Sequence, residues 1–152
     1  MSQHTTELSV LGQMLADFGE RIPGVTGSVL VTADGLVHEY AGIEEIDADR
    51  LAAGVSGIAA LVKGIFQGMP GQVQQTVMEH DGGSLFIMRA DGPEQVRNMV
   101  GAVLAVRTNP TADASLVGYE MLQWIDRMRT HLHNPVRSTE SPSAPGAPRP
   151  VQ

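Results

Sequence analysis

Cysteine is absent from this 152-residue sequence, which excludes disulfides, thiolate metal sites and a cysteine nucleophile. Basic residues are scarce as well, because 10 Lys and Arg stand against 17 Asp and Glu, for a formal net charge of -7. Nucleic acids and anionic membranes are bound mainly through clustered positive charge. We therefore expect neither nucleic acid nor an anionic lipid surface as a direct partner.

Long apolar runs are also missing. No stretch approaches the roughly 20 apolar residues that cross a bilayer. Residues 1–6 are polar, and no basic segment leads into an apolar one as in a secretory signal. We therefore expect a cytoplasmic protein without a membrane span, brought to a membrane only where its partners recruit it.

The remaining composition is that of one globular domain with tails. Hydrophobic residues make up 42% of the chain and charged residues 18%, which is enough apolar material for a core. Residues 1–6 are predicted to be a disordered lead-in and residues 7–133 the folded domain. Residues 134–152 are rich in Pro, Ser and Ala and are predicted to be a disordered tail.

Hydrophobic periodicity predicts three helices and five strands within that domain. Helices are expected at residues 7–21 and 49–66, with a last one from Asp113 or Ser115 to about residue 132. Strands are expected at residues 27–32, 36–40, 72–80, 84–89 and 99–106, with Asp-Gly turns closing two hairpins. Asp47 or Asp49 is expected to cap the second helix. This order predicts an α+β fold in which a five-stranded antiparallel sheet is flanked by helices.

The second predicted helix has two apolar faces. Its large side chains, Leu51, Val55, Ile58, Val62 and Ile65, recur at the spacing of a helix that faces a core. The other face carries a stripe of small residues: Ala53, Gly57, Ala60 and Gly64. Gly in a helix interior costs roughly 1 kcal/mol against Ala. We interpret this stripe as a contact for a second helix from another subunit, and the alternative is that the glycines are neutral in a marginal helix.

The strand at residues 72–80 is unusually polar. Its side chains alternate between Val73, Gln75, Val77 and Glu79 on one face and Gln72, Gln74, Thr76 and Met78 on the other. Such a strand suits the edge of a sheet or a seam between subunits.

Signatures of catalysis are not found. The chain has no phosphate-binding loop around its lysine, Lys63, no dinucleotide-binding glycine pattern and no Gly-x-Ser-x-Gly elbow. His131 and His133 lack a third ligand, and the acidic residues Glu44, Glu45, Asp47 and Asp49 do not match a calcium loop. We therefore expect no enzyme activity, no cofactor and no metal.

Two further groups admit a functional and a structural interpretation. His38 lies near Asp34 and Glu39 in the sequence, which could suggest a catalytic pair, but strand alternation favours a surface position. The aromatic side chains could line a ligand pocket, but with only 4% aromatics we expect them in the core. They are Tyr40, Phe86, Tyr119 and Trp124.

Five segments, taken in order, resemble the roadblock/dynein light chain family, and in particular its bacterial members from actinomycetes. They are residues 11–25, 28–36, 47–61, 75–86 and 113–121, and the resemblance covers roughly residues 8–132. The family's fold has the order of helices and strands given above. The loop at residues 90–98 looks longer than the family pattern, which puts the pairing of the last two strands in question.

The resemblance implies a regulator and not an enzyme. Its members form dimers that act as platforms or regulators for motors and Ras-like small GTPases, and bacterial members are often encoded beside a sensor kinase. Two sheets join through the third strand, here residues 72–79, with the second helices side by side. The implied dimer interface comprises Ala53, Gly57, Ala60, Gly64, Gln72, Gln74, Thr76 and Met78.

The expected function is therefore a non-enzymatic homodimeric adaptor that binds a Ras-like small GTPase, modulating GTP hydrolysis in a signalling complex with a sensor kinase. Polar side chains beside the small stripe are the candidates for the partner-facing rim: Arg50, Ser56, Lys63 and Gln67. The alternative is a small-molecule sensor domain with a ligand pocket between sheet and helix, which would need a cavity with convergent polar groups.

Overall fold

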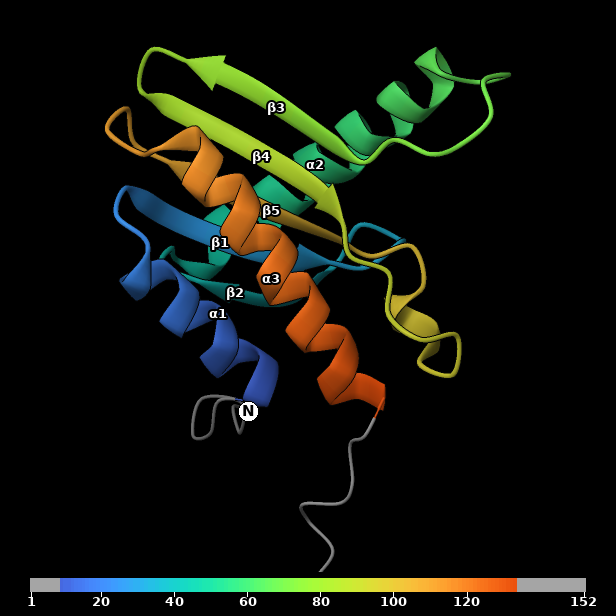
Figure 1. Cartoon of the computed structure of the whole chain (residues 1–152), viewed down its shortest axis with the longest axis horizontal. Coiled ribbons are helices and arrows are strands. Elements are labelled where there is room, and N and C mark those ends of the chain that lie inside the picture. The colour runs from blue at the N-terminus through green and yellow to red at the C-terminus, as the bar shows by residue number, and fades with distance from the viewer. Residues whose placement is uncertain (1–8, 134–152) are drawn as a thin grey trace, which may run out of the picture.

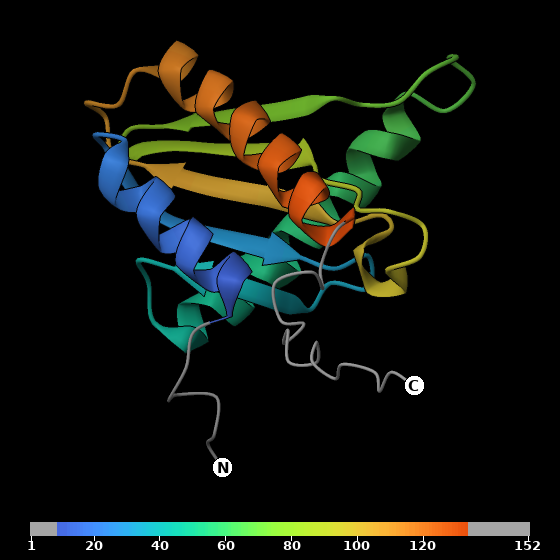
Figure 2. The same cartoon turned by 60° about the horizontal axis from the view of Figure 1, so that its bottom comes forward.

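One antiparallel sheet organises the protein, which we describe from a computed structural model over residues 9–133. The five strands lie in the order β2-β1-β5-β4-β3. Helices α1 and α3 cover one face and α2 lies on the other (Figure 1, Figure 2). The predicted α+β class and element order are confirmed. Residues 1–6 and 134–152, predicted to be disordered, lie outside the described residues.

The elements follow the predicted order with shifted ends. They are α1 (Val10–Arg21), β1 (Val25–Val31), β2 (Val37–Ala41), α2 (Glu45–Ile65), β3 (Gln75–His80), β4 (Gly83–Arg89), η2 (Arg97–Met99), β5 (Val103–Thr108) and α3 (Ala114–His133). The central strand is β5, which pairs with β1 on one side and with β4 on the other. The last strand of the chain therefore joins the two hairpins into one sheet.

Capping hydrogen bonds mark the starts of α1 and α3. The Ser9 hydroxyl accepts the Gly12 N–H at 2.9 Å and begins α1. Of the two candidates at the last helix, Asp113 is the cap, because its Oδ1 accepts the N–H groups of Ser115 and Leu116.

The predicted cap of the second helix is wrong. Helix α2 begins at Glu45, with Glu44 in the cap position and no side-chain hydrogen bond from it. Asp47 lies inside the first turn, where its Oδ1 is 3.0 Å from Nη1 of Arg50. Negative charge near a helix start is favourable without a capping bond, so the acidic run extends the helix by one turn.

The predicted last strand is displaced by the segment before it. Residues 97–99 form a 3-10 turn that buries Met99 in the core, and Gly101 follows with φ 83°. This conformation suits glycine and turns the chain into β5 only at Val103. The register of the last two strands, which the loop at residues 90–98 put in question, runs from Leu85 opposite Arg107 to Arg89 opposite Val103.

Two apolar clusters lie on the two faces of the sheet. The larger one joins α1, α3 and the sheet around Phe18, Leu104 and Trp124, which are at most 1% exposed. The smaller one lies under α2. Phe86 and Trp124 are in the core as expected, but the same expectation is wrong for Tyr40 and Tyr119, which are 37% and 58% exposed. No helix among residues 9–133 is long and apolar enough to cross a membrane.

Gly83 provides a test of the tight β3–β4 turn. Its φ is 141°, and a Cβ at this position would overlap the backbone carbonyl oxygen of Thr108. We expect Gly83→Ala to lower the free energy of unfolding by more than about 2 kcal/mol. At the neighbouring Gly82 a Cβ would meet only the ring of His80, so Gly82→Ala should stay within about 0.5 kcal/mol. Urea unfolding at matched protein concentration gives both values, and equal losses would contradict the argument.

Candidate interaction surface

The distal half of α2 extends beyond the sheet (Figure 1). The first half packs on the strands through five apolar side chains, Ala48, Leu51, Ala52, Val55 and Ile58. Beyond them, Leu61 and Ile65 are 71% and 73% exposed. The expected core-facing stripe is therefore wrong at Ile65, because the sheet no longer lies beneath that part of the helix.

The small stripe is an uncovered surface. All four of its members, Ala53, Gly57, Ala60 and Gly64, are exposed. A Cβ added at Gly54, Gly57 or Gly64 would meet no atom within 4 Å. Nothing among the described residues therefore explains why these positions lack side chains, and a second helix could approach them closely.

Strand β3 is the free edge of the sheet nearest to this overhang. Over residues 9–133 it pairs only with β4, and Val77 and Met78 are 41% and 37% exposed. An edge strand that presents apolar side chains and unpaired backbone groups is a template for pairing with another chain. Thr76 lies in β3 beside them, but Gln72 and Gln74 precede the strand, which begins at Gln75. The predicted seam strand is therefore too long at its start.

An open groove of about 800 Å³ separates the overhang from the sheet. One wall is the end of α2 and the turn after it, within residues 59–68, and another is the connector that leads into β3. Ile87 and Val103 lie on the sheet side. The groove opens to solvent and is not the enclosed pocket that a small-molecule sensor requires.

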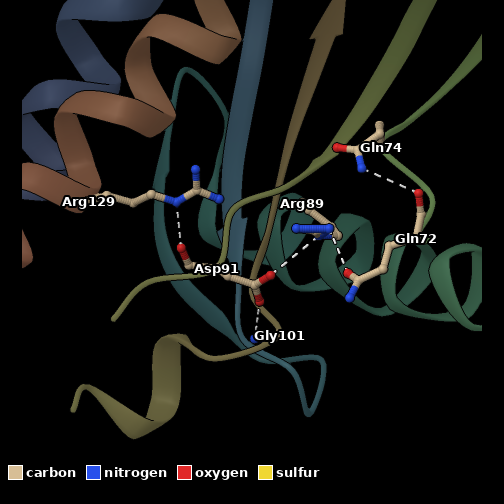
Figure 3. Close-up of polar contacts among 6 residues, drawn as sticks. All are labelled: Gln72, Gln74, Arg89, Asp91, Gly101 and Arg129. Carbon is tan, nitrogen blue, oxygen red and sulfur yellow. Dashed lines mark hydrogen bonds and ion pairs between the residues drawn. The ribbon is translucent and has the colours of Figure 1, made fainter. Parts of the chain in front are cut away.

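A polar network fixes the end of this groove (Figure 3). Nη1 of Arg89 donates to Oε1 of Gln72 at 2.6 Å, and its Nε lies 3.3 Å from Oδ2 of Asp91 as an ion pair. The other carboxylate oxygen of Asp91 accepts the Gly101 N–H at 2.5 Å. The Asp91 carbonyl accepts from Nε of Arg129 at 2.7 Å. Asp91 therefore ties the end of β4, the turn before β5 and helix α3 together, and Arg89 links them to the connector before β3.

The four residues predicted to form a partner-facing rim fall into two groups. Arg50 is 74% exposed at its side chain and paired with Asp47, and Ser56 is half-buried beside the β1–β2 turn at Gly35. Lys63 and Gln67 lie a few turns away and line the groove. The structure does not bring these two groups together.

The other sequence candidates form no site. Nδ1 of His38 is 3.9 Å from Oε2 of Glu39 without a hydrogen bond, and Glu39 instead accepts from the Ser9 hydroxyl at 2.6 Å. Over residues 9–133, no three His, Asp or Glu side chains are placed to hold a metal ion.

Comparison with known proteins identifies this fold. The sequence profile of the Roadblock/LC7 domain matches residues 11–108. The chain belongs to the Roadblock/LC7 domain family. A Roadblock/LC7 domain from Streptomyces avermitilis is 35% identical, covers 82% of this chain and 99% of its own, and superposes with a TM-score of 0.71. A second from the same organism is 32% identical over 78% and 98% of the two chains, with a TM-score of 0.62.

More distant structures share the roadblock fold. Myxococcus xanthus MglB is 17% identical, covers 84% of this chain and 98% of its own, and has a TM-score of 0.69. No curated protein matches the chain by sequence. The family match ends with β5, so α3 lies outside it, although α3 contributes Trp124, Met121 and Met128 to the core.

The roadblock sequence contains no signal from which the Asp91 network could be found. Asp91 and Gly101 are ten positions apart in an irregular loop. Arg129 comes from a helix 38 positions later. Periodicity describes regular elements, and Asp91 lies in the loop between β4 and η2.

We expect Asp91→Ala to lower the free energy of unfolding by about 0.5–1.5 kcal/mol, because it removes the acceptor of the Gly101 N–H and the ion-pair partner of Arg89. Asp91→Asn keeps an oxygen for Gly101 and should lose less. The exposed Glu94 of the same loop is the matched control, and Glu94→Ala should change stability by under about 0.5 kcal/mol. Urea unfolding compares the three, and a silent Asp91→Ala would contradict the role of this network.

Proposed function

We propose that this protein is a non-enzymatic homodimeric adaptor that binds a Ras-like small GTPase and modulates its GTP hydrolysis in a signalling complex with a sensor kinase. Membership in the Roadblock/LC7 domain family supports a GTPase-associated regulatory role. The observation that carries the proposal is the uncovered surface formed by the distal half of α2 and the free edge of β3, with the groove between them. Such a complex would assemble in the cytoplasm, or at a membrane to which its partners recruit it.

The apolar side chains that this surface leaves exposed support a homodimer. Leu61 and Ile65 on α2 and Val77 and Met78 on β3 expose apolar area that a monomer leaves in water. A second copy related by a two-fold axis would continue the sheet at β3 and lay its own α2 beside the first. One contact would then cover both the helix and the strand, and the small stripe would let the helices approach.

The GTPase would bind to what the dimer leaves exposed. Arg50 and Ser56, in the half of α2 that lies over its own sheet, remain candidates for this contact. An activator needs an arginine inserted in trans or a reshaped GTPase site. The Arg50 guanidinium is paired with Asp47 in a solvated position, where such pairs contribute little. The arrangement therefore favours reshaping or localising the GTPase over an arginine finger.

The helix contact is tested by Gly57→Leu. A leucine at this exposed position should hold the two helices apart and convert the dimer to a monomer at micromolar concentration, as sedimentation equilibrium would show. The monomer itself should stay folded, because Leu favours a helix interior over Gly by roughly 0.5–1 kcal/mol.

The control for this variant adds the same side chain to another helix. Gln123 is exposed on α3, on the opposite face of the sheet, so Gln123→Leu should leave the dimer intact. A stable dimer in Gly57→Leu would overturn the helix contact.

The partner is tested by affinity capture from the native cell lysate with either GDP or a non-hydrolysable GTP analogue added. We expect a Ras-like small GTPase to be recovered with a preference for one nucleotide state, identified by mass spectrometry. Purified GTPase should then bind the adaptor with the same preference. Recovery of the adaptor alone under both nucleotides would contradict the GTPase assignment and leave the dimer as a separate question.

A further inference from the structure

Strand β2 is the second edge of the sheet, at the opposite end from β3 (Figure 1). Over residues 9–133 it pairs only with β1, so the backbone groups on its outer side have no strand to pair with. Tyr40 on this strand is 37% exposed, and Leu36 before it and Ile46 after it are 62% and 66% exposed. An edge with unpaired backbone groups and exposed apolar side chains can accept an extended segment as an additional strand.

Most of the negative charge of the chain gathers at this edge. Residues 33–50 contain six of the 17 acidic residues and one of the 10 basic ones, so they carry -5 of the net charge of -7. The basic residue, Arg50, is already paired with Asp47. Glu44 and Glu45 are exposed, and neither has an ion-pair partner within residues 9–133. The surface around β2 therefore has unmatched negative charge.

The same charges disfavour a second copy at this edge. Acidic residues flank β2 at both ends, with Asp34 in the turn before it and Glu44 and Glu45 after it. Pairing two β2 strands in parallel would bring identical carboxylates together, and antiparallel pairing would bring Asp34 beside the glutamates of the copy. Like charges on paired strands are destabilising. The occupant of this edge should therefore be a different segment that carries positive charge.

The two faces of β2 specify the residue pattern of that occupant. Tyr40 lies opposite Val29, in the cluster under α2, whereas Glu39 lies opposite Leu30, in the cluster under α1 and α3. Successive side chains of an added strand would alternate between the same two faces. Such a strand would place apolar side chains beside Tyr40 and basic ones beside Glu39, whose carboxylate has no Lys or Arg partner within residues 9–133.

We propose that β2 is a docking edge for an extended, basic segment of a partner protein, in which lysine or arginine alternates with apolar residues. The backbone of the segment pairs with the free side of β2, and Glu44 and Glu45 at the start of α2 attract further basic side chains. This contact lies at the opposite edge from β3, so it depends neither on the proposed homodimer nor on the GTPase. The sheet then has two edges with different partners, a second copy at β3 and a basic segment at β2.

The test is a titration of the full-length chain with an end-blocked peptide of about seven residues in which Lys and Val alternate, followed by the chemical shifts of the backbone amides. At about 50 mM NaCl we expect the largest shifts within residues 37–41, and about 0.5 M NaCl should weaken binding severalfold. A peptide of the same composition with its lysines and valines in two separate blocks has the same charge but cannot match the two faces. It should bind about tenfold more weakly.

The double variant Glu44→Gln/Glu45→Gln removes the two unmatched carboxylates and should raise the dissociation constant of the alternating peptide about tenfold at low salt. The matched control, Glu94→Gln/Asp126→Asn, makes the same change in net charge at exposed positions in the loop after β4 and on α3, so its effect should stay under about twofold. Circular dichroism would verify that both variants are folded. Shifts centred outside residues 37–41, equal binding of the two peptides, equal losses in the two variants, or no binding would each overturn the proposal.

Discussion

An antiparallel sheet has two faces, and this chain covers them unequally. Helices α1 and α3 lie side by side over one face, linked by the ion pair of Arg21 with Glu120 at 2.9 Å. Within residues 9–133, α2 alone covers the other face, and only the first half of that helix packs on the strands. The central position of β5 fixes this division, because it places β3 at an edge that α2 does not cover. The exposed apolar side chains, the groove and the exposed stripe of small residues on α2 all follow from this incomplete covering of the sheet.

The elements of this fold are largely predictable from sequence because they rest on local rules. Periodicity places all three helices and five strands, and Asp-Gly pairs mark both hairpins. The small stripe on α2 is also visible in the sequence, since four small residues at helical spacing need no tertiary information. These predictions succeed because the cause of each element lies in its own residues and their near neighbours.

The errors arise where distant contacts decide. Ile65 continues the apolar spacing of α2, yet it is exposed because the sheet ends beneath the helix, which periodicity cannot detect. Tyr119 is exposed because α3 turns Trp124 and Met121 toward the sheet and leaves that position outside. The start of β5 depends on a buried Met99 and a positive φ at Gly101. The Asp91 network joins residues from β4, the turn before β5 and helix α3. No single segment of the sequence therefore predicts it.

The glycines of α2 connect stability to assembly. Gly54, Gly57 and Gly64 each cost roughly 1 kcal/mol of helix stability relative to Ala. Within the described chain they gain nothing in return, because a side chain at any of them would meet only solvent. Gly64 lies in the overhang beyond Ile58, so the half of the helix that lacks a sheet beneath it also carries part of this cost. If a second copy covers this half, association offsets the cost, and the stability of the distal turns depends on protein concentration. Folding of the overhang and formation of the seam would then be a single coupled equilibrium.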